Sequence, residues 1–586
     1  MVSKGFVYDD LLSVTHTGLM FELLQMFPIA MSHTAKQKPF SWPRSAAILP
    51  RSGVAIAAGL SVSLLFSLPV SAEAAERIRF RYGLYELIVT RAELETFAET
   101  GEAEGGLETL LDQLGAELGG QLQGALQANY DLNPVLASRF AQTRSGEQLL
   151  TEAGELIQTE SGLNGFKGLR AALVLAAAEP DGLTLLSFIE QFPTDIKIDI
   201  GQAQAIAKNF GRLLGQTQQA IGQLSAETAA LAAAEPAVDF AGLPNPSEPG
   251  RLGAVAQTLT LYDEKRDRTI VTDVYVPEAA TDSELPVIVV SNGLGAKRDR
   301  FTELATHLAS HGFAVAIPDH PGSDRERLKN FYQGLEPENF EATEFIDRPK
   351  DISFVLDELT RLDNALFAGK LAPENAGVFG YSFGGTTALA IAGAKIDSEH
   401  LQQDCETRAS LFNISLLYQC RALELPTALL TTDLRDERVQ ASYVFVPFTR
   451  SIYGPEGLSQ VEGPVLWEAT DKDILTPFVV EQLPAYNWIA NSEAERYLAI
   501  ASGLPHARIT QEVLSRITKE ESDWETIRPI AEGYHQTLST AFFQVHIANN
   551  EAYRPYLQAR GAQYLTQEPY SLTWRESPFI ADFIDE

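Results

Sequence analysis

Hydrophobic positions change their spacing along the chain at a break near residue 240. Between residues 90 and 236 they recur at helical spacing, as in LETLLDQLGAEL, GEQLLTEAGELIQ and GLRAALVLAAA, which predicts a mainly helical region. Just before it, RIRFRYGLYELIV predicts two short strands around Gly83, and Thr90 with Glu93 predicts a helix-starting capping box. The stretch FAGLPNPSEPGRLG, with three prolines and three glycines, then predicts an interdomain linker.

After the linker, short apolar runs alternate with helical segments. LPVIVVSNG is an apolar run bounded by turn residues, as a strand buried on both faces should be. The helical segments RFTELATHLASHG and KDISFVLDELTRL separate it from the strands FAVAIPDH and AGVFGYS, and later strands are expected at 441–448, 464–470 and 496–502. Strands alternating with helices predict a mostly parallel sheet with crossovers, so the expected fold class is α/β.

These patterns divide the chain into four parts. We expect a leader at 1–74, a mainly helical N-terminal domain of unassigned role at 75–236, a linker at 237–253 and an α/β domain at 254–586. An insertion at about 396–440 interrupts the α/β domain. It should lie over the carboxyl edge of the sheet, where ligands bind in such folds.

The leader has the pattern of a secretory signal peptide. Residues 53–70 carry no charge, follow a basic stretch and precede Ala72, Glu73 and Ala74, which predicts cleavage after Ala72 or Ala74. An uncleaved membrane anchor is the alternative, since about 18 residues is near the lower limit for crossing a bilayer. A start at Met31 would leave a more ordinary signal peptide. The mature protein is expected to be extracytoplasmic (periplasmic or secreted), with no stable membrane insertion.

Charge and composition exclude several classes of function. Acidic residues outnumber basic ones by 78 to 45, giving a net charge of −33, which repels phosphate backbones and excludes nucleic acid as a leading partner. The nine histidines are scattered and there are only two cysteines, so neither a Cys-rich metal site nor a disulfide framework is expected. No metal or cofactor is implied. The sequence does not indicate an oligomeric state.

The motif Gly380–Gly384 (GYSFG) is the only Gly-x-Ser-x-Gly in the chain and lies where a strand meets a helix. A serine on such a sharp turn is held in a strained conformation with its hydroxyl exposed. The flanking glycines keep the turn clear of its neighbours, where a Cβ atom would collide. Ser382 is therefore the candidate nucleophile.

An earlier loop, SNGLG at 291–295, follows the first parallel strand. Such a loop can direct a backbone N–H at a developing oxyanion, and the residue after the nucleophile supplies a second. This predicts an oxyanion hole formed by the main-chain nitrogens of Leu294 and Phe383. The alternative is an ordinary turn at the end of a strand.

A histidine is expected in a loop after the last strand of such a fold. Four histidines follow Ser382, but His400 lies in the insertion, and His535 and His546 lie in helical sequence. Only His506 lies in a loop just past a strand. It is therefore the candidate general base.

Two segments resemble a known family. SNGLGAKRDRFTELATHLASHGFAVAIPDHPGSD and GYSFGGTTA are similar to the platelet-activating-factor acetylhydrolase and dienelactone-hydrolase-like branch of the α/β-hydrolases. The whole chain also resembles secreted serine hydrolases of cyanobacterial type, whose N-terminal domain has no assigned role. The family often has His where this chain has Asn292 and Tyr381, and dienelactone hydrolases proper use a cysteine where this chain has Ser382. The resemblance implies an α/β-hydrolase fold and esterase chemistry.

Two acids, Asp471 and Asp473, follow the strand at 464–470. Asp473 precedes Pro477 by four residues, which resembles the Asp-x-x-x-Pro loop of the α/β-hydrolase acid. We therefore expect Asp473 to complete a Ser382–Asp473–His506 triad, and Asp471 to lie in an exposed turn.

Together these features predict a serine-dependent carboxylic ester hydrolase that forms an acyl-enzyme. The expected substrate is a small-molecule or lipid ester, of short-chain or phospholipid type. The alternatives are a lipase or thioesterase acting on longer acyl chains, and a catalytically silent binding protein on a hydrolase fold. The apolar insertion is expected to line or cover an acyl pocket, or else to be a packed cap without substrate contact. Cys405 and Cys420 would close a short loop in it if oxidised.

Overall fold

The computed structural model describes residues 74–580, except for 115, 131, 280–282, 408, 491–493, 509 and 512–523. The expected signal peptide and the Met31 start lie outside the described residues. Among the described helices, none combines the length and apolar character needed to cross a membrane.

The chain forms two compact units. The larger unit contains Val135–Glu152 and the chain from Asn209 onward, whereas the smaller contains the described residues up to Pro134 together with Ala153–Lys208. This division differs from the expected break at 237–253, because residues before that break have partners in the C-terminal region. Thr228, for example, donates a 2.9 Å hydrogen bond to the carbonyl of Trp574.

The segment expected to be a linker packs within the larger unit. The side chain of Phe240 is 8% exposed, and its ring stacks on that of Tyr564 with the centroids 4.2 Å apart. Just before the segment, the carboxylate of Glu235 accepts hydrogen bonds from the backbone N–H groups of Ala559 and Arg560. A proline- and glycine-rich composition here marks an irregular but anchored connection, not a free linker.

The smaller unit combines helices with a four-stranded sheet of order β2-β1-β6-β4. The expected hairpin around Gly83 is present, and Thr90 and Glu93 form the expected capping box at the start of the first described helix. The strands are β1 (Arg77–Tyr82), β2 (Tyr85–Thr90), β4 (Ile157–Thr159) and β6 (Ile196–Asp199), and a separate pair is formed by β3 (Asn129–Tyr130) and β5 (Leu183–Thr184). The helices include α2 (Arg91–Thr100), α3 (Gly105–Leu114), α4 (Ala116–Gln127), α7 (Phe166–Ala177) and α8 (Leu185–Glu190).

The larger unit is built on a nine-stranded sheet of order β15-β14-β13-β12-β11-β9-β10-β8-β7. Its centre is parallel from β10 through β9, β11, β12 and β13 to β14, and its two edges are antiparallel. The strands are β7 (Val255–Asp263), β8 (Arg268–Val276), β9 (Leu285–Ser291), β10 (Ala314–Pro318), β11 (Leu371–Tyr381), β12 (Val439–Phe445), β13 (Val465–Thr470), β14 (Arg496–Ala501) and β15 (Leu572–Arg575). The expected mostly parallel sheet is confirmed.

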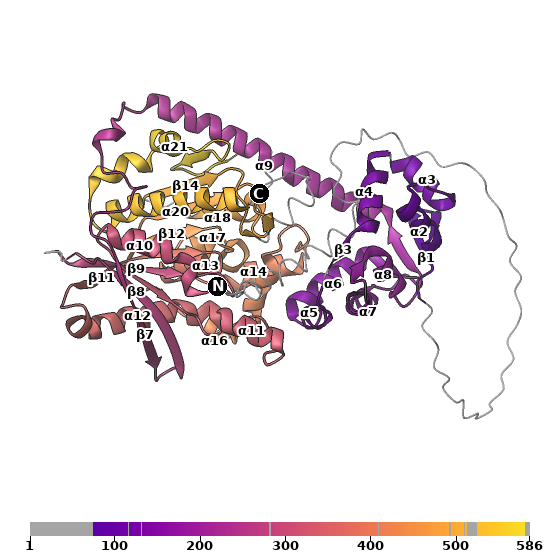
Figure 1. The fold of residues 1–586 in the computed structure, drawn as a ribbon, viewed down its shortest axis with the longest axis horizontal. Coiled ribbons are helices and arrows are strands. Elements are labelled where there is room, and N and C mark those ends of the chain that lie inside the picture. Colours follow the sequence, from indigo (N-terminus) through magenta and orange to yellow (C-terminus); the bar gives the residue numbers. More distant parts are fainter. Residues whose placement is uncertain are drawn as a thin grey trace, which may run out of the picture. The chain divides into compact units, whose positions relative to one another are not determined.

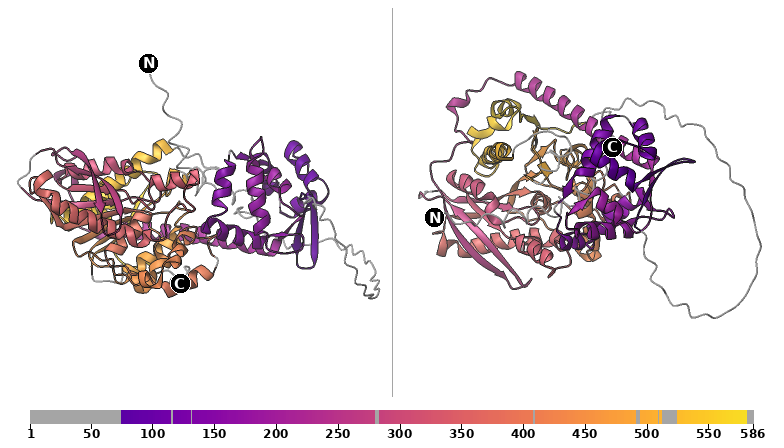
Figure 2. Two further views of the ribbon diagram at one scale, coloured as in Figure 1. Left: turned by 90° about the horizontal axis from the view of Figure 1, so that it is seen from below. Right: turned by 45° about the vertical axis from the view of Figure 1, so that its right-hand side comes forward.

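Both faces of the sheet are buried. On β9, Ile288 and Val290 join a core cluster with residues of α10 and α20, while the alternating Val287 and Val289 are equally inaccessible. Because successive side chains of a strand point to opposite faces, the sheet is covered on both. Figures 1 and 2 show α20 and α21 beside the strands, and α10 packs on α20 while α12 packs on α13. The helices are α10 (Thr302–Ser310), α11 (Arg325–Gln333), α12 (Glu344–Leu366), α13 (Phe383–Ile391), α17 (Arg450–Leu458), α18 (Leu483–Ile489), α20 (Trp524–His546) and α21 (Ala559–Leu565).

The insertion after α13 is helical and crosslinked. It contains α14 (Ser398–Glu406), α15 (Leu416–Gln419) and α16 (Thr427–Leu430), and a disulfide joins Cys405 to Cys420. In the C-terminal region, the aromatic residues Tyr534, Phe542, Phe543, Tyr553 and Tyr556 belong to the core, as expected. Strand β15 was not expected, because four residues at an antiparallel edge carry too short a pattern to distinguish from a loop.

Candidate active site

Ser382 occupies a sharp turn between β11 and α13. Its backbone has φ +54° and ψ −116°, a strained conformation for a residue with a side chain. A Cβ atom on Gly380 would lie 2.2 Å from the carbonyl oxygen of Gly384, and one on Gly384 would lie 1.8 Å from that of Ser291. Both positions therefore require glycine, for the reason expected from the motif.

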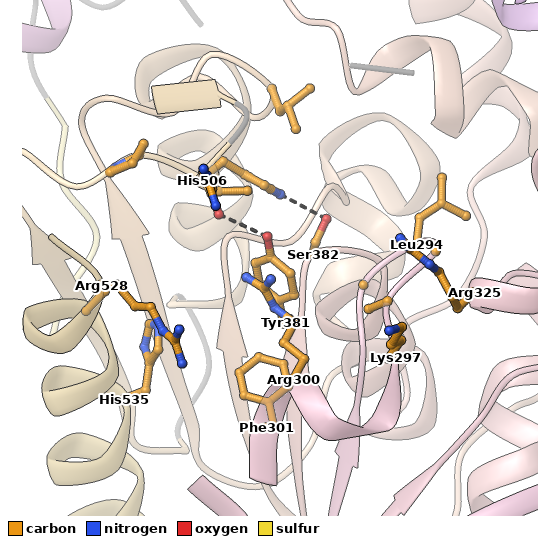
Figure 3. Close-up of a pocket in the computed structure, with 18 of the residues that line it drawn as sticks. Leu294, Lys297, Arg300, Phe301, Arg325, Tyr381, Ser382, His506, Arg528 and His535 are labelled. Carbon is orange, nitrogen blue, oxygen red and sulfur yellow. Dashed lines mark hydrogen bonds between the residues drawn. The ribbon is translucent and has the colours of Figure 1, made fainter. Parts of the chain in front are cut away.

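His506 and Asp473 lie next to this turn, in the loops that follow β14 and β13. The Nε2 atom of His506 is 3.1 Å from the hydroxyl oxygen of Ser382, and its Nδ1 atom is 2.6 Å from Oδ2 of Asp473 (Figure 3). The carboxylate of Asp473 also accepts hydrogen bonds from the backbone N–H groups of Leu475 and Thr476. These bonds hold the carboxylate toward the imidazole, so the structure brings these three side chains together.

The other acid and the other late histidines lie elsewhere. Asp471 accepts a 2.6 Å hydrogen bond from the N–H of Gly503. His535 lies 2.8 Å from the carboxylate of Glu468, and His546 lies 3.2 Å from the hydroxyl of Tyr497. His400 belongs to α14, with Asp404 one turn further along the same helix.

The loop carrying Leu294 passes directly beside Ser382. A Cβ atom on Gly293 would lie 3.4 Å from the Cβ atom of Ser382. Within the described part of the chain, the main-chain N–H groups of Leu294 and Phe383 donate no hydrogen bond. Two free donors beside a serine hydroxyl are the arrangement that an oxyanion hole needs.

Two protein-family models match the chain. Residues 74–199 match a family described as "Alpha/beta hydrolase of unknown function (DUF1400)". Residues 243–338 match "Platelet-activating factor acetylhydrolase, isoform II", a segment that includes the Leu294 loop and ends before Ser382. The larger unit has the α/β-hydrolase fold. The chain resembles platelet-activating factor acetylhydrolases, and both matches support hydrolase chemistry.

A buried arginine holds the Leu294 loop in place. Arg348, on α12, is 1% exposed and donates 2.7 Å hydrogen bonds to the carbonyl of Asn292 and to the hydroxyl of Ser323. Its guanidinium carbon also lies 4.2 Å from the centre of the Phe383 ring. Burial lowers the pKa of Arg348 to about 10, so the side chain stays cationic at neutral pH. One side chain thus contacts both segments that carry the free N–H groups.

Behind the loop lies a second Ser-His-Asp arrangement. His320 is 3.0 Å from the hydroxyl of Ser291 through Nε2 and 3.0 Å from Asp351 through Nδ1. All three side chains are buried, none lines the cavity described below, and burial lowers the pKa of His320 to about 4. A neutral, inaccessible imidazole can brace the end of β9 but cannot meet a substrate.

Ser382 and His506 open into a cavity of about 630 Å³ (Figure 3). The insertion contributes Ser415 and Tyr418 to its wall, and α20 contributes a further side that includes Ile527. Sequence reasoning missed α20, whose side chains were assigned to the core alone. It also missed the hydrogen bond from the hydroxyl of Tyr381 to the main-chain carbonyl of His506, since no sequence signal shows which loop will lie opposite this hydroxyl.

Among the described residues, no group of three His, Cys, Asp or Glu side chains is placed to hold a metal ion. His307, on α10, and His311, which caps the end of this helix, instead bond to the carbonyls of Pro246 and Glu248. Burial lowers the pKa of His307 to about 4. These histidines therefore anchor the 237–253 segment to the end of α10 within the larger unit.

Proposed function

We propose that this protein is a serine-dependent carboxylic ester hydrolase that acts through an acyl-enzyme. The observation that carries the proposal is the geometry of Ser382, which stands on a strained turn with His506 Nε2 3.1 Å from its hydroxyl. Asp473, 2.6 Å from the other ring nitrogen, would hold the imidazole in the tautomer that accepts a proton at Nε2.

The reaction follows from these positions. His506 takes the proton of Ser382 as the serine oxygen bonds to the ester carbonyl carbon, and the carbonyl oxygen becomes an oxyanion. The N–H groups of Leu294 and Phe383 stabilise that charge. The intermediate collapses when the alcohol leaves with the proton from His506, and water, activated by the same imidazole, then releases the acid.

The cavity supports an ester of moderate size. Its volume of about 630 Å³ falls in the usual range for small-ligand sites, and apolar side chains such as Leu294, Tyr418 and Ile527 line it. A short-chain or phospholipid-type ester fits this description. Longer acyl chains, as in a lipase or thioesterase substrate, would have to extend out of the cavity.

A fluorophosphonate probe tests the chemistry on purified residues 75–586. We expect covalent labelling of Ser382, and none in the matched Ser382→Ala variant. A panel of 4-nitrophenyl esters from acetyl to palmitoyl then gives the acyl preference. Absence of labelling in folded protein would contradict the proposed esterase function and favour a catalytically silent binding protein.

We also propose that the protein is exported. An uncharged segment at 53–70, preceded by basic residues and followed by Ala72 and Ala74, supports a cleaved signal peptide. The N-terminus of protein secreted by its native host should be Glu73 or Ala75. A membrane-bound form that retains 53–70 would show that the segment is an anchor.

A further inference from the structure

The cavity wall has the opposite charge balance to the rest of the chain. Acidic residues outnumber basic ones by 78 to 45 overall, yet among the described residues more cations than carboxylates line the cavity. The cations are Lys297, Arg300, Arg325, Arg508 and Arg528, and the carboxylates are Asp299, Glu303 and Glu532.

Two of these three carboxylates attract the same cation, Arg528. Glu532 forms a 2.7 Å ion pair with Arg528 on the same helix, and this hydrogen bond raises the pKa of Arg528. Glu303 adds a weaker attraction to the same guanidinium. The other four cations of the wall are Lys297 and Arg300 after the Leu294 loop, Arg325 at the start of α11, and Arg508 after His506.

Arg300 contacts the residue that precedes the candidate nucleophile. Its guanidinium carbon lies 4.5 Å from the centre of the Tyr381 ring, and Tyr381 is the residue before Ser382. Within the described residues Arg300 forms no ion pair and its guanidinium donates no hydrogen bond. In Figure 3 it lies beside Tyr381, below Ser382. The contact with the ring leaves the N–H donors of the guanidinium available to a ligand.

We infer that this cavity takes esters that carry an anionic group, a carboxylate or a phosphate, which Arg300 binds. The inference rests on the proposed esterase function and specifies its substrate class. Guanidinium groups bind planar or tetrahedral oxyanions through paired hydrogen bonds. In a protein with net charge −33, the overall field repels anions, so admitting one requires a local cation such as Arg300.

Three matched acetate esters test the charge preference. They are 4-acetoxybenzoate (anionic), methyl 4-acetoxybenzoate (neutral) and 4-acetoxybenzyltrimethylammonium (cationic), each measured as kcat/KM relative to its own hydroxide-catalysed rate. We expect the anion to exceed the neutral ester by about tenfold, as one charged hydrogen-bonded contact supplies, and the cation to be the poorest. Added salt should reduce the advantage of the anion.

Substitutions then identify the residue. Arg300→Gln should remove most of the anion-to-neutral ratio of kcat/KM, and Arg300→Lys should restore part of that ratio. Arg361→Gln is the control, because Arg361 is 64% exposed, pairs with Glu358 and does not line the cavity. It should leave the ratio as in the parent protein.

The outcomes are distinguishable. Hydrolysis of the neutral or cationic ester as fast as the anion, or an unchanged ratio in Arg300→Gln, overturns the inference and leaves the esterase proposal intact. Failure to hydrolyse all three esters, together with no fluorophosphonate labelling of Ser382, overturns the esterase proposal and this inference with it.

Discussion

The hydroxyl of Tyr381 donates a 2.9 Å hydrogen bond to the main-chain carbonyl of His506 (Figure 3). Tyr381 ends β11 and directly precedes Ser382, so the strand that presents the serine also holds the loop that presents the histidine. Burial raises the pKa of Tyr381, and the phenol therefore stays a neutral donor at working pH. Its ring stacks on Phe445 at 5.4 Å, which fixes the direction of the hydroxyl.

Removing this hydroxyl should misplace the imidazole without disturbing the core. Tyr381→Phe keeps the ring and its stacking on Phe445 but deprives the His506 carbonyl of its partner. Such a bond contributes about 1 kcal/mol, so kcat should fall about fivefold while KM stays nearly constant. Steady-state kinetics on 4-nitrophenyl acetate measure this. Unchanged kcat would mean that the loop holds its position by packing alone.

The choice of acid can be tested by two matched substitutions. Asp473→Asn should leave folding nearly intact but allow the wrong imidazole tautomer, lowering kcat by about 10⁴, and Ser382→Ala should cost on the order of 10⁶. Asp471→Asn should change kcat less than about tenfold, because asparagine can still accept from the N–H of Gly503. A large loss in Asp471→Asn with a nearly silent Asp473→Asn would contradict the assignment.

The parts of this site that the sequence predicts are those that depend on local spacing. The glycines around Ser382 indicate a tight strand-to-helix turn. The position of His506 just after a parallel strand indicates that it lies at the carboxyl edge of the sheet. In contrast, the bond between Tyr381 and His506 joins residues 125 positions apart. Whether two such residues meet depends on strand order, which one sequence does not contain. The same reason applies to Arg348 and to the α20 wall of the cavity.

Stability should fall in mild acid, because His307 and His320 are buried in neutral form. Burial lowers the pKa of each to about 4, whereas an unfolded histidine titrates near 6.5. Below about pH 6.5 the unfolded chain therefore binds protons that the folded chain does not. Each histidine removes up to roughly 1.4 kcal/mol of stability per pH unit until the pH passes its folded pKa.

His307→Gln isolates one of these contributions, because glutamine can still donate to the carbonyl of Pro246. Urea unfolding between pH 7.5 and 4.5 should show a shallower loss of stability in this variant than in the parent. Tryptophan fluorescence is the suitable signal, since every tryptophan after residue 74 belongs to the larger unit. Identical slopes in the two proteins would show that His307 is already protonated in the folded state.

Substitution of Arg348 tests whether its contact with the Leu294 loop contributes to catalysis. Arg348→Lys retains the charge, but one ammonium cannot reproduce the two 2.7 Å bonds to the Asn292 carbonyl and the Ser323 hydroxyl. Stability should drop by about 1–3 kcal/mol, as for a buried polar group left without a partner. If the loop carries an oxyanion donor, kcat should fall by up to about a hundredfold with KM nearly unchanged, because the lost contact acts on the transition state.

A matched control separates the two effects in that experiment. Arg438 pairs with Asp436 and Asp357 at a half-buried position that does not line the cavity. Arg438→Lys should therefore cost little stability and leave kcat as in the parent protein. Kinetics should be measured well below the unfolding midpoint of each variant, so that the active fraction is the same. If Arg348→Lys then loses stability but keeps its kcat, the arginine contributes only to folding. The position of the Leu294 N–H group then does not depend on Arg348.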